Sequence, residues 1–460
     1  MHQIQKLRGI SKLVYGVGDV GNAMVNSAIG FYLMLFYTDG ALIAPALAAN
    51  ALLIGKVWDA VNDPLFGWIS DRTTSRLGKR RVYMIFGALP LSIAIMLLWR
   101  VPRGLGDVGI FVWIAFTFLF FDTVWTLTNV PYYALTAELT DDYDERSSLT
   151  AYRMVLGVPA YIVGAALTPV IVGLFVTERA GYAAVGIVYG TVAALALWIS
   201  AAGIKERKLV SESRSKAAPA RAFLETFKNL PFVRLIAAYL IANTAFALVK
   251  TLLAYFLTYQ LDMEEQVPVV MLVLLVFVAL FLFPWKLLSD RWNKGPAYAL
   301  GLGIGGTAMA ATFLLPHQPT PWVYLIAIVA GIGFSANWVF PWAMVPDVVE
   351  HDRLRTGEHR GGIYYGVWGL AVKISEALGI VATGWMLQLY GYVADVEQSA
   401  HTLFGIRLFF GPVPAVLFAI ALPLLIWYPI TRASHAVMLK QLSAKETPSN
   451  GVKETQAKTA

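Results

Sequence analysis

The chain has 460 residues, of which 58% are hydrophobic and 14% charged, and its formal net charge is +7. A soluble globular protein carries roughly a quarter charged residues, so this composition excludes a soluble protein of one or several domains. The absence of cysteine excludes disulfide frameworks, thiol catalysis and thiolate metal sites.

Apolar stretches recur from residue 13 to residue 430, each long enough to cross a hydrocarbon core of about 30 Å as a helix. Charged and Pro/Gly-rich breaks divide them into twelve predicted spans: 13–38, 46–70, 82–101, 108–137, 149–176, 181–203, 232–260, 266–288, 296–315, 321–346, 362–391 and 403–429. The sequence therefore predicts an all-α membrane protein with twelve transmembrane helices.

Lysine and arginine are distributed unequally over the connections between these spans. Alternate connections hold nearly all of them, and the other side has only Arg100, Arg103 and Arg179. By the positive-inside rule, both termini and the connection 205–231 face the cytoplasm, which predicts a multi-pass protein of the plasma (inner) membrane. The cations are spread over separate loops rather than gathered in one stripe, so the net charge does not indicate a nucleic-acid partner.

One long polar connection divides the spans into six and six. Two similar runs, GWISDR (67–72) and KLLSDR (286–291), stand at the end of the second span on either side of it and suggest duplication. Six plus six spans with a cytoplasmic middle loop is how major facilitator superfamily transporters are organised. The predicted parts are an N-terminal half (1–204), a cytoplasmic linker (205–231), a C-terminal half (232–431) and a flexible cytoplasmic tail (432–460).

Several predicted spans carry polar side chains along one helical face. A charge at the bilayer centre costs about 2.5–3.5 kcal/mol on insertion scales, so each charge needs a partner, a cavity or a function. Stripes on several helices avoid lipid together only by facing a common central cavity. The stripes are Asp19, Asn22 and Asn26; Asp59, Asn62 and Asp63; Asp122, Thr126, Asn129 and Tyr133; Arg153; Asn243 and Lys250; and Tyr365, Lys373 and Glu376.

Asp59 and Asp63 form the sharpest of these groups. Two carboxylates one helical turn apart repel each other, so one is protonated, neutralised by a bound cation, or paired with a lysine or arginine. Together with the Asn62 amide and the Thr126 hydroxyl they offer hard oxygen ligands, which suit Na⁺ or a proton rather than a soft metal. The alternative is a permanent ion pair with Lys56, Arg153 or Lys373 that only holds helices together.

Aromatic side chains accompany the polar stripes. Trp125, Tyr133 and Trp338 lie in segments rich in polar groups, where flat apolar faces beside hydrogen-bonding groups suit a sugar ring. Core packing or an interfacial belt is the alternative reading of each ring. The histidines have no metal-ligand spacing, and there is no GxxxxGK[ST] motif or nucleophile group, so we expect no enzyme, no cofactor and no metal beyond Na⁺.

Longer runs carry a family resemblance. YGVGDVGNA (15–23), KVWDAVNDPLFGWISDR (56–72), TLTNVPYYALTAELTDDYDERSSLTAYR (126–153) and MVPDVVEHDRLRTGEHRGGIYYG (344–366), followed by Lys373, resemble the glycoside–pentoside–hexuronide:cation symporters, the melibiose permease group of the major facilitator superfamily. The resemblance extends over about residues 12–430 and implies the major facilitator fold and cation coupling.

The resemblance also implies roles for individual residues. It implies a coupling-cation site at Asp59, Asn62, Asp63 and Thr126, and a sugar cavity lined by Asn22, Trp125, Asn129, Tyr133, Arg153, Trp338 and Lys373. The wider superfamily implies a cytoplasmic gate of Asp71, Arg72, Arg76, Asp144 and Arg146. The chain departs from melibiose permease at Asn129 and Ala23, where that protein has aspartates, so the resemblance does not imply a melibiose-like galactoside as substrate. The loss of a carboxylate at Asn129 also leaves both H⁺ and Na⁺ open as the coupling ion.

We therefore predict a secondary active transporter that couples a cation to a sugar, glycoside or sugar acid by alternating access. Its expected partners are a small-molecule substrate and the lipid bilayer, and we expect a monomer. One alternative is symport of an amphipathic lipid such as a lysophospholipid, with the cavity cations taking the head-group phosphate. Another is a membrane sensor or scaffold that transports nothing.

Overall fold

A computed structural model of the chain describes residues 7–140, 142–204, 206, 219–358, 360–394 and 396–446, and over these ranges the regular structure is helical. The first long helices are α1 (Gly9–Leu35), α2 (Pro45–Arg72), α3 (Arg81–Leu98), α4 (Asp107–Leu139), α5 (Tyr143–Gly173) and α6 (Glu178–Gly203). After the short helix α7 (Pro219–Thr226) come α8 (Leu230–Tyr255), α9 (Val267–Arg291), α10 (Lys294–Thr312), α11 (Trp322–Thr356), α12 (Gly361–Leu389), α13 (Ala400–Phe410), α14 (Pro412–Ile426) and α15 (Arg432–Glu446).

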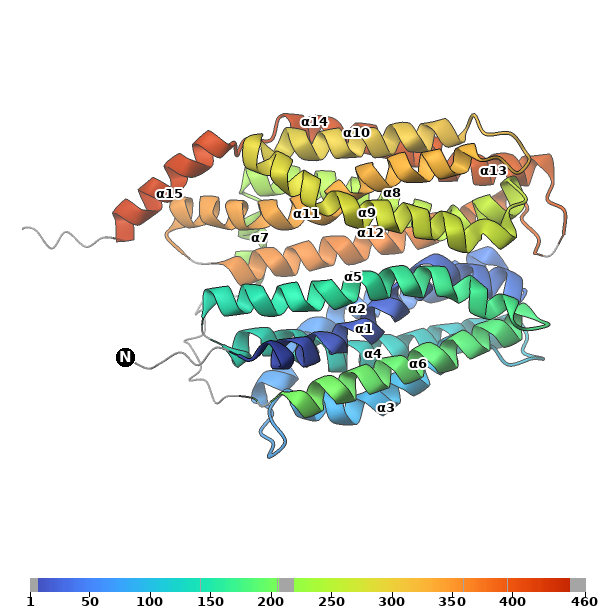
Figure 1. The fold of residues 1–460 in the computed structure, drawn as a ribbon, viewed down its shortest axis with the longest axis horizontal. Helices are drawn as coiled ribbons and strands as arrows, with labels where there is room; N and C mark the ends of the chain where they lie inside the picture. The colour runs from blue at the N-terminus through green and yellow to red at the C-terminus, as the bar shows by residue number, and fades with distance from the viewer. Residues whose placement is uncertain are drawn as a thin grey trace, which may run out of the picture.

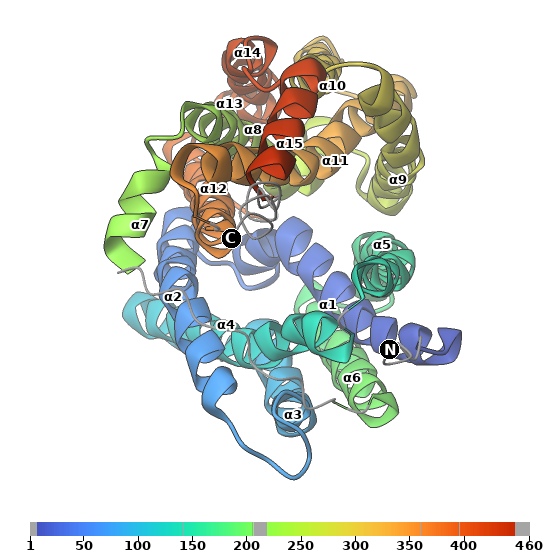
Figure 2. The same cartoon turned by 90° about the vertical axis from the view of Figure 1, so that its left-hand side faces the viewer.

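The long helices run side by side in two groups (Figure 1). Helices α1 to α6 form one group, and α8 to α14 form the other. The start of α1 and the helix α15 lie at the same end of the bundle (Figure 2). Residues 205 and 207–218 of the predicted linker, and residues 447–460 of the predicted tail, lie outside the described residues.

Ten segments of the described chain are long and apolar enough to cross a membrane. One of them, Ala400–Ile426, comprises both α13 and α14. Of the twelve predicted spans, those of α2 and α10 are missing from this set because α2 carries several charged residues and α10 is rich in glycine and alanine. Both still pack among the other helices, α2 against α4 and α12, and α10 against α11 and α14. The all-α architecture is confirmed.

Local sequence signals mark many helix ends. Pro45 opens α2, a position where proline removes no helical hydrogen bond. Thr177 and Ser399 cap α6 and α13, since their hydroxyl oxygens accept bonds from the backbone N–H groups of Ala180 and Thr402. Helix α11 ends at Gly357, whose φ of 76° lies in the left-handed region that glycine adopts without strain.

Small residues bring the helices close together. A Cβ atom at Gly21 of α1 would lie 2.3 Å from the Cα atom of Ala193 in α6, so the two helices touch through their backbones. Close contact through small residues is typical of membrane helices, which cannot use the hydrophobic effect to associate. This packing fixes the orientation of the polar face of α1.

Helix α7 is tied to the connection between α11 and α12 by Arg360. The Arg360 guanidinium lies 2.6 Å from a carboxylate oxygen of Glu358 and 2.5 Å from a carboxylate oxygen of Glu225, which belongs to α7. The hydrogen bonds to Glu358 and Glu225 raise the pKa of Arg360 above its usual value, against the opposing effect of burial. Arg360 therefore stays charged over the whole physiological pH range.

Candidate functional site

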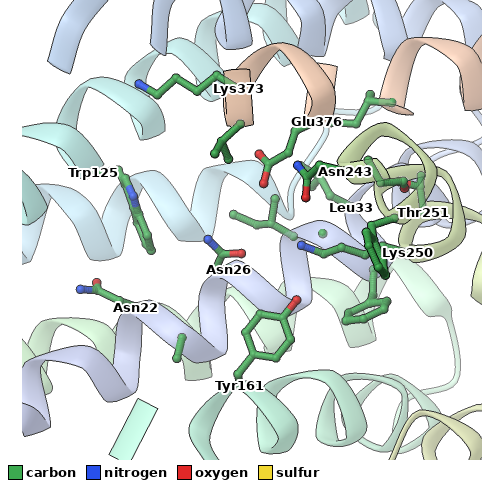
Figure 3. A pocket seen from close by; sticks show the side chains of 18 of the residues that line it. Asn22, Asn26, Leu33, Trp125, Tyr161, Asn243, Lys250, Thr251, Lys373 and Glu376 are labelled. Atoms are coloured by element: carbon green, nitrogen blue, oxygen red, sulfur yellow. The ribbon is translucent and has the colours of Figure 1, made fainter. Parts of the chain in front are cut away.

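A cavity of about 670 Å³ lies between the two groups of helices. Most of the polar stripes predicted from the sequence contribute side chains to this cavity, as Figure 3 shows for several of them, so the prediction of a common central cavity is confirmed for these stripes. Arg153 and Tyr365 lie outside its lining. Among the predicted site residues, those that line it are Asn22, Asp59, Asp63, Trp125, Thr126, Asn129, Tyr133, Trp338 and Lys373. Asn62 and Arg153 stand behind the lining and contact residues in it.

The carboxylates of Asp59 and Asp63 are bridged by one lysine. The Lys373 ammonium lies 2.7 Å from Asp59 Oδ1 and 2.6 Å from Asp63 Oδ2, and it also donates to the Asp59 carbonyl oxygen at 2.5 Å. Lys373 belongs to α12 and the two acids to α2, so this ion pair joins the two helix groups. Of the outcomes considered for two adjacent carboxylates, this conformation therefore shows pairing with a lysine.

Neutral oxygen atoms surround the carboxylate pair. Thr126 Oγ1 on α4 lies 3.0 Å from Asn62 Oδ1 and 3.1 Å from Asp63 Oδ1. Asn62 is fully buried, and its Nδ2 donates to Asp122 Oδ2 at 2.7 Å. The four residues predicted to form the cation site are thus connected by hydrogen bonds or by Lys373, and Asp122, which lines the cavity, accepts a hydrogen bond from Asn62.

This ligand set suits a monovalent cation. The described residues contain no group of three or more histidine, cysteine, aspartate or glutamate side chains arranged to hold a metal ion. Two carboxylates with an amide oxygen and a hydroxyl oxygen provide hard ligands of low total charge, which fits Na⁺ or a proton better than a divalent ion. In this conformation the charge beside the two carboxylates is the Lys373 ammonium.

A second ion pair crosses between the same two helices. Lys56 Nζ of α2 lies 2.8 Å from Glu376 Oε2 of α12. The sequence analysis named both residues but did not pair them, because sequence spacing within one helix cannot show which residue faces it from another helix.

Arg153 belongs to a different part of the cavity wall. Its guanidinium lies 3.5 Å from both carboxylate oxygens of Asp19 and stacks over the Tyr133 ring at 4.4 Å. Nearby, the Asn22 amide donates to Asn129 Oδ1. Asn22, Asn129, Tyr133 and Arg153 therefore form a polar wall between α1, α4 and α5 that is separate from the carboxylate pair.

Aromatic rings line the cavity beside this wall. Trp338 of α11 meets Tyr161 of α5 edge to face, with ring centroids 5.5 Å apart, and Trp338 is 41% exposed. Trp125 of α4 also lines the cavity and packs on Phe121. The two predicted tryptophans are thus positioned to contact a substrate. Tyr161 was not singled out from the sequence.

The residues of the predicted cytoplasmic gate make contacts with other residues of the first helix group. Asp71 pairs with Arg80 at 2.5 Å, and Arg80 also lies 2.8 Å from Glu138 of α4. Arg72 stacks over the Trp68 ring at 3.9 Å, and Arg146 donates to the Thr140 carbonyl oxygen at 2.9 Å. These contacts stay within the first helix group, and Arg76 is exposed. The Asp144 side chain lies outside the described part of the chain.

At the opposite end of the bundle, a buried aspartate joins the two helix groups. Asp39, 6% exposed, accepts hydrogen bonds from the hydroxyl groups of Tyr392 at 2.5 Å, Tyr259 at 2.6 Å and Thr38 at 2.6 Å. Thr38 also bonds the Tyr255 hydroxyl at 2.7 Å. We call these five residues the Asp39 cluster. It joins the two helix groups at this end, and it was not predicted from the sequence because its tyrosines come from segments far apart in the chain.

Comparison with known proteins agrees with this architecture. The sequence model of the family described as MFS/sugar transport protein matches residues 14–432. The chain belongs to this family of the major facilitator superfamily. It is therefore a multi-pass membrane protein with a transporter fold, and the predicted superfamily is confirmed.

Individual relatives are symporters. An uncharacterized symporter of Synechocystis sp. is 30% identical, and the alignment covers 96% of this chain and 98% of that one. Sodium-dependent lysophosphatidylcholine symporter 1 of Mus musculus is 27% identical over 98% of this chain and 91% of that one. A solved structure reported for substrate recognition in proton-dependent oligopeptide transporters superposes with a TM-score of 0.64 at 13% identity, covering 95% of this chain and 100% of the other, which shows the shared fold.

Proposed function

We propose that this protein couples the movement of Na⁺ or H⁺ to uptake of a sugar, glycoside or sugar acid by alternating access. The observation that carries the proposal is the bridge from Lys373 of α12 to Asp59 and Asp63 of α2. This bridge lies at the seam between the two helix groups, and it supports the proposal because a cation that replaced the lysine there would change how the groups are held together.

Coupling follows from competition at this bridge. An entering cation would take the two carboxylates, with Asn62 Oδ1 and Thr126 Oγ1 as further ligands, and release the Lys373 ammonium into the cavity. The released ammonium then becomes a hydrogen-bond donor for the substrate, so each ligand favours binding of the other. One cation crossing 100 mV supplies about 2.3 kcal/mol, enough for roughly fortyfold accumulation of a neutral solute.

The polar wall and the aromatic rings suit a sugar. Asn22, Asn129 and Tyr133 offer donors and acceptors for hydroxyl groups, and Trp125 and Trp338 offer flat apolar faces for ring CH groups. The cavity volume of about 670 Å³ is within the range of small-molecule sites.

A second candidate substrate is an amphipathic lipid. The α9 side of the cavity is lined by Leu274, Leu275 and Val278, with Phe246 and Phe334 adjacent, and this apolar surface would suit an acyl chain. The similarity to a lysophosphatidylcholine symporter supports this alternative. In both cases the positive-inside rule places the termini in the cytoplasm and the Asp39 cluster at the outer end of a plasma-membrane protein, and we expect it to act as a monomer.

The test is uptake by the purified full-length chain in proteoliposomes. Labelled pentosides, hexuronates, disaccharides and lysophosphatidylcholine are offered with Na⁺ and H⁺ gradients imposed separately. We expect accumulation of one substrate class that requires one of the gradients, and loss of uphill uptake but retention of exchange in Asp63→Asn. Accumulation that needs neither gradient contradicts the coupling model, and the absence of any uptake or exchange favours a sensor or scaffold.

A further inference from the structure

Lys250 differs from the other cations of the cavity. Lys373 is held by Asp59 and Asp63, Lys56 by Glu376, and Arg153 by Asp19. Within the described part of the chain the Lys250 ammonium forms no ion pair or side-chain hydrogen bond, although this residue lines the same cavity. Lys250 is therefore a cavity cation that no carboxylate of the described residues pairs with.

The surroundings of Lys250 do not neutralise its charge. Its ammonium lies 5.7 Å from the centroid of the Phe31 ring and 5.8 Å from that of Tyr161, distances at which the ring faces attract a cation only modestly. Glu376 is the carboxylate whose field reaches Lys250, but it is already bound by Lys56 at 2.8 Å. An ammonium held within a membrane protein without a counter-ion is costly, so an anion arriving from water would bind there favourably.

The position of Lys250 is set by a glycine of the opposite helix group. A Cβ atom at Gly30 of α1 would lie 1.7 Å from Lys250 Cε and 2.0 Å from Nζ, so the lysine side chain lies across the space left by the missing side chain. Lys250 belongs to α8 and thus reaches from one helix group to the other. Figure 3 shows Lys250, Asn26 and Tyr161 directed toward the same part of the cavity.

We propose that Lys250 binds an anionic group of the transported molecule, a carboxylate or a phosphate, and so selects charged over neutral substrates. The inference rests on the proposed function, since it assigns a substrate class to the same cavity. The cation would bind at the α2 carboxylates and the substrate anion on the α8 side, with opposite charges at separate places in one cavity. Asn26 and Tyr161 lie beside the anion site and would contact the atoms next to the charged group.

The test compares substrates that differ in one charge. Binding is measured with purified full-length protein for phenyl glucuronide against phenyl glucoside, and for lysophosphatidic acid against monoacylglycerol. A preference for the anion in the first pair indicates that the protein binds a sugar carboxylate, and a preference in the second pair indicates that it binds a lipid phosphate. We expect the native protein to prefer the anion in at least one pair.

Substitutions then show whether Lys250 causes this preference. Lys250→Met should lower the ratio of anion to neutral affinity by about tenfold or more, because it removes a charge-assisted hydrogen bond. Lys250→Arg should keep most of the ratio. Gly30→Ala keeps the charge but displaces the ammonium, and it should also lower the ratio. Lys228→Met, an exposed lysine outside the cavity, serves as the matched control and should leave the ratio unchanged.

The outcomes separate this inference from the proposed function. Equal affinity for charged and neutral members of both pairs overturns the role of Lys250, and so does a preference that persists in both Lys250→Met and Gly30→Ala. Gly30→Ala keeps the test decisive if Lys250→Met does not fold. Anion binding that depends on Lys250 but drives no gradient-dependent uptake would support the inference and contradict the symporter. Ion-driven uptake of a neutral glycoside that is insensitive to Lys250→Met would support the symporter and contradict the role of Lys250.

Discussion

At the scale of single residues, the central feature is that Lys373 uses its three hydrogen-bond donors on α2. Its ammonium donates hydrogen bonds to the Asp59 and Asp63 carboxylates and to the Asp59 carbonyl oxygen. A lysine ammonium is a compact charge with three donors, so this geometry satisfies it fully. The same contacts neutralise two carboxylates that would otherwise repel each other. In the proposed mechanism, Lys373 would therefore take the place of the coupling cation in this conformation.

Replacing Lys373 should strengthen binding of the coupling ion. In Lys373→Gln the carboxylates lose their internal competitor, so the affinity for Na⁺, or for H⁺ if the proton is the coupling ion, should rise by about tenfold or more. Ion-dependent tryptophan fluorescence of the purified protein measures this, with Lys228→Met as the control. A lower ion affinity in Lys373→Gln would show that the lysine supports the ion site and does not compete for it.

Arg80 shows a second arrangement in which one side chain serves several partners. Its Nη1 donates to Ser70 at 2.5 Å, its Nη2 to Asp71 at 2.5 Å and its Nε to Glu138 at 2.8 Å. Only a planar guanidinium presents donors in these three directions at once. The residue is buried, and it fixes the connection after α2 to α4.

Arg80→Lys should therefore destabilise the protein although the charge is kept. Losing one or two hydrogen bonds to charged groups costs about 2 kcal/mol, discounted here because Asp71 is half exposed. We expect a melting temperature a few degrees lower in detergent. Arg72→Lys, which alters an exposed arginine on Trp68, is the matched control. Equal melting temperatures for the two variants would contradict this role of Arg80.

At the scale of helices, glycine decides how closely α1 and α6 approach. Gly21 faces the backbone of Ala193, which cannot yield as a side chain would. Gly303 of α10, in contrast, has open space where a Cβ atom would be placed. The two glycines therefore differ in packing while both lie within helices.

Gly21→Ala should destabilise the protein, and Gly303→Ala should not. Overpacking at a backbone contact costs about 1–3 kcal/mol, whereas alanine in an open helical position is favourable by up to about 1 kcal/mol. Thermal unfolding of both variants measures the difference. If Gly21→Ala proves as stable as the native chain, α1 and α6 are not in backbone contact there.

At the scale of the whole molecule, the two helix groups are joined in the middle by ion pairs and at one end by the Asp39 cluster. The ion pairs in the middle of the molecule include the groups proposed to bind the cation, so we expect these ion pairs to change during transport. The Asp39 cluster contains no such group, and its hydroxyl donors all meet one carboxylate or its neighbour Thr38. We therefore expect it to control which end of the cavity is open.

Asp39→Asn should open this end more often. The carboxylate accepts several charge-assisted hydrogen bonds, so its loss should shift the equilibrium between closed and open states by about tenfold. The chain lacks cysteine, so Leu33→Cys, a buried cavity position near this end, can report access by reaction with an impermeant maleimide. Tyr428→Phe, which removes a buried hydroxyl without a described partner, is the control. Unchanged labelling in Asp39→Asn would exclude the cluster as a closure.

The sequence by itself determined the helical architecture and the polar side chains of the central cavity, and from these it predicted the ligand types of a cation site. The physical reason is that a bilayer requires long apolar helices and confines polar side chains to one face of each, and both patterns are local. Asp59, Asn62, Asp63 and Thr126 were recognised in this way. Helix α2 is not apolar enough to be recognised as a membrane span from its hydropathy, because it carries polar side chains on the face that lines the cavity.

Only the tertiary structure decided which charges meet. The choice of Lys373 for the carboxylates, Glu376 for Lys56 and Asp19 for Arg153 depends on the packing of separate helices, which spacing within one helix does not encode. The same holds for the Asp39 cluster and for Lys250, which forms no ion pair within the described residues although carboxylates line the same cavity. Pairing in a low-dielectric interior is decided by ångström-scale distances, and these follow from close contacts such as that of Gly21 with Ala193.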